Sequence, residues 1–378
     1  MKIPGLYIHV PFCIRKCGYC DFYSVTSTSL IPEYLEALFR EMEMYRGRFD
    51  AFDTVYIGGG TPSVLSAEQI RGILATIRSN VDLLPDREIT VETNPGDLSL
   101  PYLESLREIG INRLNIGAQS FDQKVLDFLG RRHSAEEAAS AIVDARKVGF
   151  GNIGLDLIYG VPGQEVASWL DTLNRALSFE PEHLSCYQLT VEEKTPLGRT
   201  CARGECTVPG EELQYQFFMK TSENLENAGY IHYEVSNFAR GMTFASRHNQ
   251  KYWDHSPYLG FGPAAHSFQG NQRWWNHRSV EKYVSTIRSG NFPIREQEVL
   301  SVEQLRLESL YLGLRTRVGM NLKEISNEVG KGFDTKGNNF IDQLLRKDLV
   351  TIRNGFVRPT RSGLAVADGL TALLASFL

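Results

Sequence analysis

The sequence lacks several features that would assign a chain at once to a broad class of protein. Lys and Arg number 40 against 45 Asp and Glu, a formal net charge of -5, so a general attraction to nucleic acid is excluded. No apolar run reaches the roughly 18 residues that a membrane-spanning helix needs. The first residues show neither the apolar stretch nor the cleavage site of a signal peptide. These absences predict a cytoplasmic protein without a transmembrane segment.

Cysteine is scarce and unevenly distributed. Three of the six cysteines, Cys13, Cys17 and Cys20, lie within the string HVPFCIRKCGYC at residues 9–20. A fourth cysteine is missing beside them, although a closed zinc or iron–sulfur site normally has four protein ligands. Six cysteines in a chain of 378 residues indicate a reducing compartment and a metal site more than a disulfide framework.

The other three cysteines carry a weaker signal. Cys186 lies in a predicted buried strand, where it serves as a small apolar side chain. Cys201 and Cys206 offer only two ligands, and we therefore assign no second metal site to them.

The first half of the chain alternates short β-rich runs with longer segments whose apolar residues recur every three or four positions. Strands are predicted at residues 6–10, 54–57, 89–92, 113–117, 153–159 and 184–189. Repeated βα units build a parallel sheet that binds its ligands at the carboxyl ends of the strands. Residues 1–190 are therefore predicted to form an α/β fold, a partial six-unit TIM-like barrel with one site at that edge.

The pattern changes after residue 190. Residues 191–300 are predicted to be a linking region with a helix at 211–228 and a segment at 244–277 that is rich in histidine and aromatic residues. Residues 301–378 are predicted to form a winged-helix-like α+β domain. Its expected elements are helices at 302–317, 322–329 and 335–347, followed by a hairpin at 349–360 around an Asn-Gly turn.

Glycine and polar residues follow the predicted strands and should meet at one edge of the sheet. The glycines of GGGTP allow close backbone approach, and free N–H groups there would suit a carboxylate or amino-acid group. Arg131 is able to pair with a carboxylate. Taken singly, Arg131 is equally consistent with a surface ion pair and Glu92 with a structural turn.

Three thiolates would hold three irons of a [4Fe–4S] cube and leave the fourth iron open. The spacing C-x3-C-x2-C, directly after the first strand and with Tyr19 before its last cysteine, resembles the radical S-adenosylmethionine (SAM) superfamily. The resemblance implies that SAM binds the open iron and that an electron from the cluster cleaves its sulfonium. A zinc site or three ordinary buried thiols would also account for the cysteines by themselves.

The strings LYIHVPFCIRKCGYCDF, GGGTPS, ETNPG, IGAQSF and DLIYGVPGQ closely resemble the oxygen-independent coproporphyrinogen III dehydrogenase-like family. The resemblance covers essentially the whole chain. It implies that Tyr7 lies beside the cluster and SAM, and it implies further cofactor contacts by Tyr19, Gly59, Gly60, Thr61, Glu92, Gln119, Arg131 and Asp156.

Two branches of this family must be distinguished. The porphyrinogen dehydrogenases carry a long N-terminal extension and a Cys-Gly-Cys ending to the cluster motif, whereas here six residues precede Tyr7 and Cys20 is followed by Asp21-Phe22. RHNQKYW at 247–253 fits the H-N-x-x-Y-W motif of the haem chaperone (HemW-type) branch. The resemblance implies a protein without dehydrogenase activity that delivers haem to acceptor proteins, for which respiratory-chain proteins are candidates. The oligomeric state stays open, and a homodimer is one of the alternatives.

His248 is a candidate axial ligand of haem iron, with Tyr252 and Trp253 on the porphyrin face. Residues 244–277 contain His248, His255, His266 and His277 together with Trp253, Trp274 and Trp275. Such a cluster suits a flat iron macrocycle. It is equally consistent with a turn or a core cluster of hydrogen-bonded imidazoles.

Two other functions remain open. One is oxidative decarboxylation of coproporphyrinogen III by a deoxyadenosyl radical. The other is nucleic-acid binding by the C-terminal domain, whose residues 345–361 are locally basic. The predicted recognition helix at 335–347 lacks a basic stripe along one face, which weighs against nucleic acid as a partner.

Overall fold

The computed structural model describes residues 2–321 and 335–376. Twelve strands form one sheet in the order β12-β11-β10-β9-β1-β2-β3-β4-β5-β6-β8-β7. Its central strands are parallel and follow the chain: β1 (Gly5–Val10), β2 (Ala51–Gly59), β3 (Asp82–Thr93), β4 (Arg113–Gln119), β5 (Ile153–Tyr159) and β6 (His183–Gln188). The six predicted strands are thus confirmed, as is the partial barrel.

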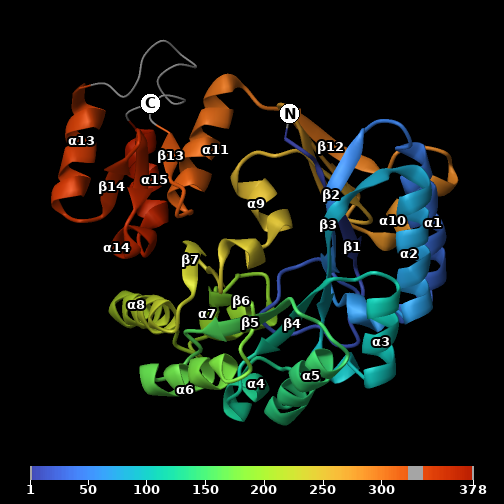
Figure 1. The fold of residues 1–378 in the computed structure, drawn as a ribbon, viewed down its shortest axis with the longest axis horizontal. Coiled ribbons are helices and arrows are strands. Elements are labelled where there is room, and N and C mark those ends of the chain that lie inside the picture. Colours follow the sequence, from blue (N-terminus) through green and yellow to red (C-terminus); the bar gives the residue numbers. More distant parts are fainter. Residues whose placement is uncertain (1, 322–334, 377–378) are drawn as a thin grey trace.

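Helices cover the outer face of this parallel sheet (Figure 1). They are α1 (Ile31–Met44), α2 (Ala67–Asn80), α3 (Leu100–Glu108), α4 (Gln123–Phe128), α5 (Ala135–Lys147) and α6 (Val166–Leu177). Local sequence explains their starts and packing. Ser66 and Gln69 form a capping box at the start of α2, whose buried face carries Ile70, Ile73 and Ile77.

Side chains of β1 alternate between the two faces of the sheet. Leu6, Ile8 and Val10 are fully buried in the main core. Tyr7 and His9 lie on the opposite face, where their side chains contact each other. The barrel interior is therefore lined with polar aromatic residues, and the layer beneath the helices is apolar.

Residues 191–300 have a larger part in the fold than the predicted linking role. β7 (Ile231–Glu234) and β8 (Asn237–Ala239) extend the sheet beside β6, whereas β9 (Tyr258–Phe261) pairs parallel with β1. β10 (His266–Gln269), β11 (Gln272–Asn276) and β12 (Ile294–Val299) follow as antiparallel strands. Strands of three to six residues carry too little alternation to be recognised, yet they cover the two edges of the parallel sheet.

The same segment supplies α7 (Pro196–Ala202), α8 (Glu211–Asn227), α9 (Arg247–Trp253) and α10 (Val280–Arg288). α8 confirms the helix predicted at 211–228. α9 contains the RHNQKYW string and lies between the sheet and the C-terminal unit (Figure 1).

The C-terminal unit contains α11 (Val302–Leu314), β13 (Met320–Asn321), α13 (Thr335–Arg346), β14 (Val350–Arg353), β15 (Phe356–Pro359), α14 (Arg361–Leu364) and α15 (Ala367–Ala375). The predicted hairpin is confirmed: Asn354 and Gly355 connect β14 to β15 with φ of 52° and 79°. The helix predicted at 322–329 lies outside the described residues. The unit is joined to β7 by an ion pair between Arg315 and Glu234 at 3.2 Å.

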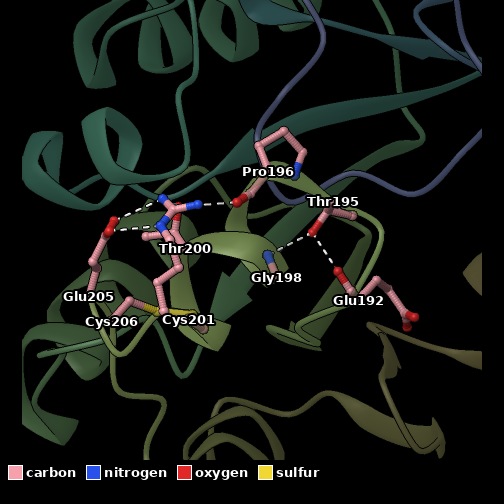
Figure 2. The surroundings of a disulfide bond; sticks show 9 residues. Glu192, Thr195, Pro196, Gly198, Thr200, Cys201, Glu205 and Cys206 are labelled. Atoms are coloured by element: carbon pink, nitrogen blue, oxygen red, sulfur yellow. Dashed lines mark hydrogen bonds and ion pairs between the residues drawn. A yellow bond between two sulfur atoms is a disulfide. The ribbon is translucent and has the colours of Figure 1, made fainter.

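A disulfide between Cys201 and Cys206 closes the loop after α7 (Figure 2). The sequence did not predict this bond, because the low cysteine count argued against disulfides. The helix it follows contacts the cysteine-rich loop, since the backbone N–H of Leu197 donates to the carbonyl of Gly18 at 2.9 Å. Among the described residues, none of the helices is both long and apolar enough to cross a membrane.

Candidate functional site

A cavity of about 590 Å³ opens at the carboxyl ends of the parallel strands. Its wall does not include Tyr7, Cys13 or Cys17, but it brings together eight of the cofactor contacts that the resemblance implied and the last cysteine of the triplet. These residues are Tyr19, Cys20, Gly59, Gly60, Thr61, Glu92, Gln119, Arg131 and Asp156. The βα topology explains most of this convergence, because the ends of β1, β2, β3 and β4 or the loops after them supply wall residues, whereas Asp156 lies within β5 and Arg131 follows α4.

The three clustered cysteines lie on the loop between β1 and α1, and all three are free thiols. The Thr61 hydroxyl donates to Sγ of Cys13 at 3.3 Å, and Nη1 of Arg131 lies 3.5 Å from Sγ of Cys17. Burial raises the pKa of Cys20, and the neighbouring Cys17 and Cys13 add to the rise. A bound cation would reverse this preference and hold the thiolates.

The described residues include no three side chains that converge as ligands of one metal ion. In an iron–sulfur cube each thiolate binds a different iron, so its ligands need not converge on one point. Three thiols on one short loop beside a polar cavity therefore fit a cluster with one open iron.

Two buried polar atoms in the cavity wall lack hydrogen-bond partners among the described residues, namely Nε of Arg131 and Oδ1 of Asp156. The other atoms of these groups are held in place. Nη2 of Arg131 donates to the Gly117 carbonyl at 2.9 Å, and Asn115 donates to Oδ2 of Asp156 at 2.6 Å. A buried donor and a buried acceptor left open in the wall of one cavity fit a ligand that carries both a carboxylate and hydroxyl or amino groups, as SAM does.

Glu92 and Asp156 place two buried carboxyl groups in the same cavity. Burial raises the pKa of Glu92 to about 7, and the nearby Asp156 adds to the rise. Burial likewise raises the pKa of Asp156 to about 6. A cationic ligand would restore the charged form of both groups, and SAM carries an amino group and a sulfonium.

The glycines after β2 act differently from the prediction. We expected free N–H groups that receive a ligand, but Gly60 and Thr61 donate to the carbonyls of Val10 and Phe12 at 2.8 and 2.7 Å, and Gly59 donates to Glu92 at 3.1 Å. A Cβ on Gly60 would lie 2.7 Å from the Phe12 carbonyl oxygen. Glycine is required here because β2 packs closely against the start of the cysteine loop.

Tyr7 lies on the inner face of β1, beside His9 and His248. Its hydroxyl contacts Nδ1 of His9 at 3.0 Å, and its ring stacks on that of His248 at 6.3 Å. It does not belong to the residues that line the 590 Å³ cavity.

Several wall residues were missed by sequence reasoning. Tyr187 and Gln188 end β6, so the rule that found the other strand ends would have included them. Asn115 lies within β4, and its role depends on facing Asp156 across the sheet. Tyr56 lies behind the wall and donates its hydroxyl to Glu92 at 2.7 Å, a pairing that only the three-dimensional register shows.

α9 closes the interior of the barrel below this cavity. His248 is 1% exposed; its Nδ1 contacts the Thr54 hydroxyl and its Nε2 the Tyr252 hydroxyl, both at 2.9 Å. Burial lowers the pKa of His248 to about 3. Both nitrogens of this neutral imidazole are therefore occupied, which matches the alternative of a hydrogen-bonded core histidine and leaves neither nitrogen free for iron.

The other aromatic residues of 244–277 do not form one cluster. Trp253 lines a separate cavity on the outer side of α9. Trp274 is buried in the main core, where its indole N–H lies 3.2 Å from the Tyr45 hydroxyl. His266 stacks on Trp275 across the β10–β11 pair. α9 thus brings Trp253 to that separate cavity of about 660 Å³, while Tyr252, Tyr258 and Phe268 line a smaller one of about 270 Å³.

The cysteine triplet after the first strand, the parallel partial barrel and the polar cavity at its carboxyl edge define the chain as a radical SAM protein. Residues 7–176 match the family described as "Radical SAM superfamily", and residues 300–366 match the family described as "HemN C-terminal domain".

Relatives define the family more narrowly. The chain is 36% identical over 363 residues to "Heme chaperone HemW" of Bacillus subtilis (strain 168), which covers 94% of this chain and 95% of the relative. It is 36% identical over 327 residues to the protein of that name in Mycobacterium tuberculosis (strain ATCC 25618 / H37Rv), covering 85% and 84%. The chain belongs to the HemW family.

A solved structure shares the whole fold. Coproporphyrinogen III oxidase (HemN) from Escherichia coli, described as a radical SAM enzyme, superimposes with a TM-score of 0.85. The match covers 100% of this chain and 91% of the other, at 22% sequence identity. This likeness concerns the fold.

Proposed function

We propose that the protein is a haem chaperone that binds haem and transfers it to acceptor haemoproteins. The observation that carries the proposal is the 36% identity over 94% of the chain to a relative named as a heme chaperone. The cluster motif supports the same branch, because Cys20 is followed by Asp21 and Phe22 rather than by a Cys-Gly-Cys ending.

In this proposal Cys13, Cys17 and Cys20 hold a [4Fe–4S] cluster, and SAM occupies the 590 Å³ cavity. When bound, the cluster and SAM supply one-electron chemistry at the sulfonium. The open Nε of Arg131 and Oδ1 of Asp156 then bind polar groups of SAM. Glu92 positions the end of β2 through Gly59.

The same proposal includes haem contact through the α9 motif, but Trp253 has a different role from His248 and Tyr252. Trp253 reaches an open cavity, where an indole ring would pack on a porphyrin. His248 and Tyr252 are hydrogen-bonded to each other inside the barrel. Iron ligation by His248 would require both of its hydrogen bonds to break.

Haem transfer is the direct test. The cluster-reconstituted protein is titrated anaerobically with haemin and should give a saturable Soret shift. Mixed with an apo-haemoprotein, the loaded protein should pass haem on faster than haemin bound to serum albumin does. A Soret spectrum equal to that of free haemin would reject the proposal.

The same preparation distinguishes the chaperone from the oxidase. Incubation with SAM, a reductant and coproporphyrinogen III should leave the propionates intact. Formation of vinyl porphyrinogen would instead establish the oxidative decarboxylation that the dehydrogenase branch carries out.

A further inference from the structure

A second cavity, of about 660 Å³, lies between α9 and the C-terminal unit. We call it the α9 cavity. Trp253 and Met242 line it from the side of the sheet domain, and Val318, Met320 and Phe356 line it from the C-terminal unit. Its volume is within the range of sites that enclose a small organic ligand.

Three arginines of the C-terminal unit line the α9 cavity, and two of them, Arg317 and Arg358, form a cationic end. Arg317 and Arg358 line it, and both also line a smaller adjoining cavity of about 210 Å³ that contains Arg353 and Arg361. Nε of Arg358 is buried and has no hydrogen-bond partner within the described part of the chain. A buried guanidinium N–H without a partner favours an anionic ligand group at this end.

Carboxylates do not balance these arginines in the described wall of the α9 cavity. Its one acidic residue, Asp254, is already paired with Lys2 at 3.7 Å. The cavity therefore combines an apolar wall with aromatic rings and a cationic end. A ligand that matches it is flat, largely apolar and carries carboxylates on one side.

We propose that haem binds in the α9 cavity, with its propionates against Arg317 and Arg358 and Trp253 packed on its face. This inference rests on the proposed haem-chaperone function and deepens it by assigning the site. It places haem outside the barrel, separated from the 590 Å³ cavity by the buried side of α9.

The assignment also changes which histidine a bound haem meets. His255 lines the α9 cavity, whereas His248 does not. Nδ1 of His255 lies 3.2 Å from the hydroxyl of Ser309, another wall residue, and Nε2 lies 3.2 Å from the carboxylate of Glu308. Iron ligation by His255 would require its contact with Ser309 to break, as ligation by His248 would require a hydrogen bond to break. The contact with the Glu308 carboxylate would then orient the His255 ring as in a typical metal-bound histidine.

The test compares haemin with haemin dimethyl ester, which lacks the propionate charges, by Soret titration of the full-length reconstituted protein. The wild type should bind haemin about tenfold or more tightly than the ester, as expected for charge-assisted hydrogen bonds. The double variant Arg317→Gln, Arg358→Gln should lose this preference and bind the ester as the wild type does. Arg353→Gln, which alters only the smaller cavity, is the matched control and should keep the preference.

The outcomes separate the site from the function. Haemin binding that is equally tight in the wild type and the double variant would place haem elsewhere and leave the chaperone proposal standing. No haemin binding by the wild type would reject both. Trp253→Leu, which leaves the arginines in place, should weaken haemin and its ester equally; unchanged binding of both would remove Trp253 from the site.

Discussion

The carboxylate of Glu41 accepts a hydrogen bond from the hydroxyl of Tyr283 at 2.6 Å, although the two residues are 242 positions apart. It also accepts from the backbone of Gly262 at 2.8 Å and from the side chain of Asn276 at 2.6 Å. Glu41 thereby joins α1 to β11, to α10 and to the residue that follows β9. Because it is fully buried, its protonation is linked to folding.

We expect Glu41 to make the protein less stable as the pH rises from about 4.5 to 7. Burial raises its pKa to about 7, whereas the ordinary value is 4.5. The native state therefore holds more protons than the unfolded chain in this window, and the free energy of unfolding falls with rising pH. The full effect is at most about 3 kcal/mol.

The variant Glu41→Gln should flatten this dependence in urea unfolding measured between pH 5 and pH 7. The control is Glu36→Gln, which alters an exposed carboxylate of the same helix that pairs with Arg288. If the free energy of unfolding of Glu41→Gln depends on pH as steeply as that of the wild type, the Glu41 carboxyl group is not the cause of the pH dependence.

The variant His248→Phe should cost stability rather than haem binding. It keeps an aromatic ring against Tyr56, 5.2 Å away, but removes the hydrogen bonds to Thr54 and Tyr252. We expect a loss of about 1–3 kcal/mol in the free energy of unfolding. Haemin titration of the folded variant should match the wild type, whereas His255→Ala should alter the Soret band. The reverse pattern would restore His248 as the haem ligand.

Replacing Arg131 by Lys should weaken SAM binding about tenfold, because the single nitrogen of lysine cannot hold the Gly117 carbonyl and also place an N–H where Nε of Arg131 lies. Iron content should stay at the wild-type value. Equilibrium dialysis with SAM measures the first quantity and a ferrozine assay the second. Arg132→Lys is the neighbouring control, since Arg132 is paired with Asp97. Equal SAM affinity in Arg131→Lys and the wild type would exclude the contact.

Substitutions in the cysteine triplet and in the disulfide should have different effects on the iron content of the protein. Cys17→Ser should lose most of the iron and sulfide and the visible absorption of the cluster. The double variant Cys201→Ser, Cys206→Ser should keep them, because these thiols are joined in a disulfide. Loss of iron from the double variant would mean that α7 contributes to the cluster.

Much of the wall of the candidate site could be predicted because many of its residues lie at the ends of parallel strands, and strand ends can be read from hydrophobic patterns. Gly59 and Glu92 were placed at the edge in this way, whereas Asp156 lies within β5 and was assigned through the resemblance to the family. The hydrogen-bond partners of these residues could not be predicted from the sequence. Tyr56, for example, contacts Glu92 only because of the register of β2 against β3. The hydrogen bonds of His248 could not be predicted for a related reason: a sequence motif does not show which side of a short helix enters the barrel.

The pairing of β9 with β1 has a consequence for synthesis on the ribosome. β1 is among the first segments to emerge, but β9, the strand that covers its outer edge, follows about 250 residues later. β8, which covers the outer edge of β6, follows about 50 residues after β6. At the usual rates of elongation the nascent sheet therefore carries open edges for tens of seconds. We expect premature termination near residue 190 to give aggregating fragments rather than a free-standing barrel.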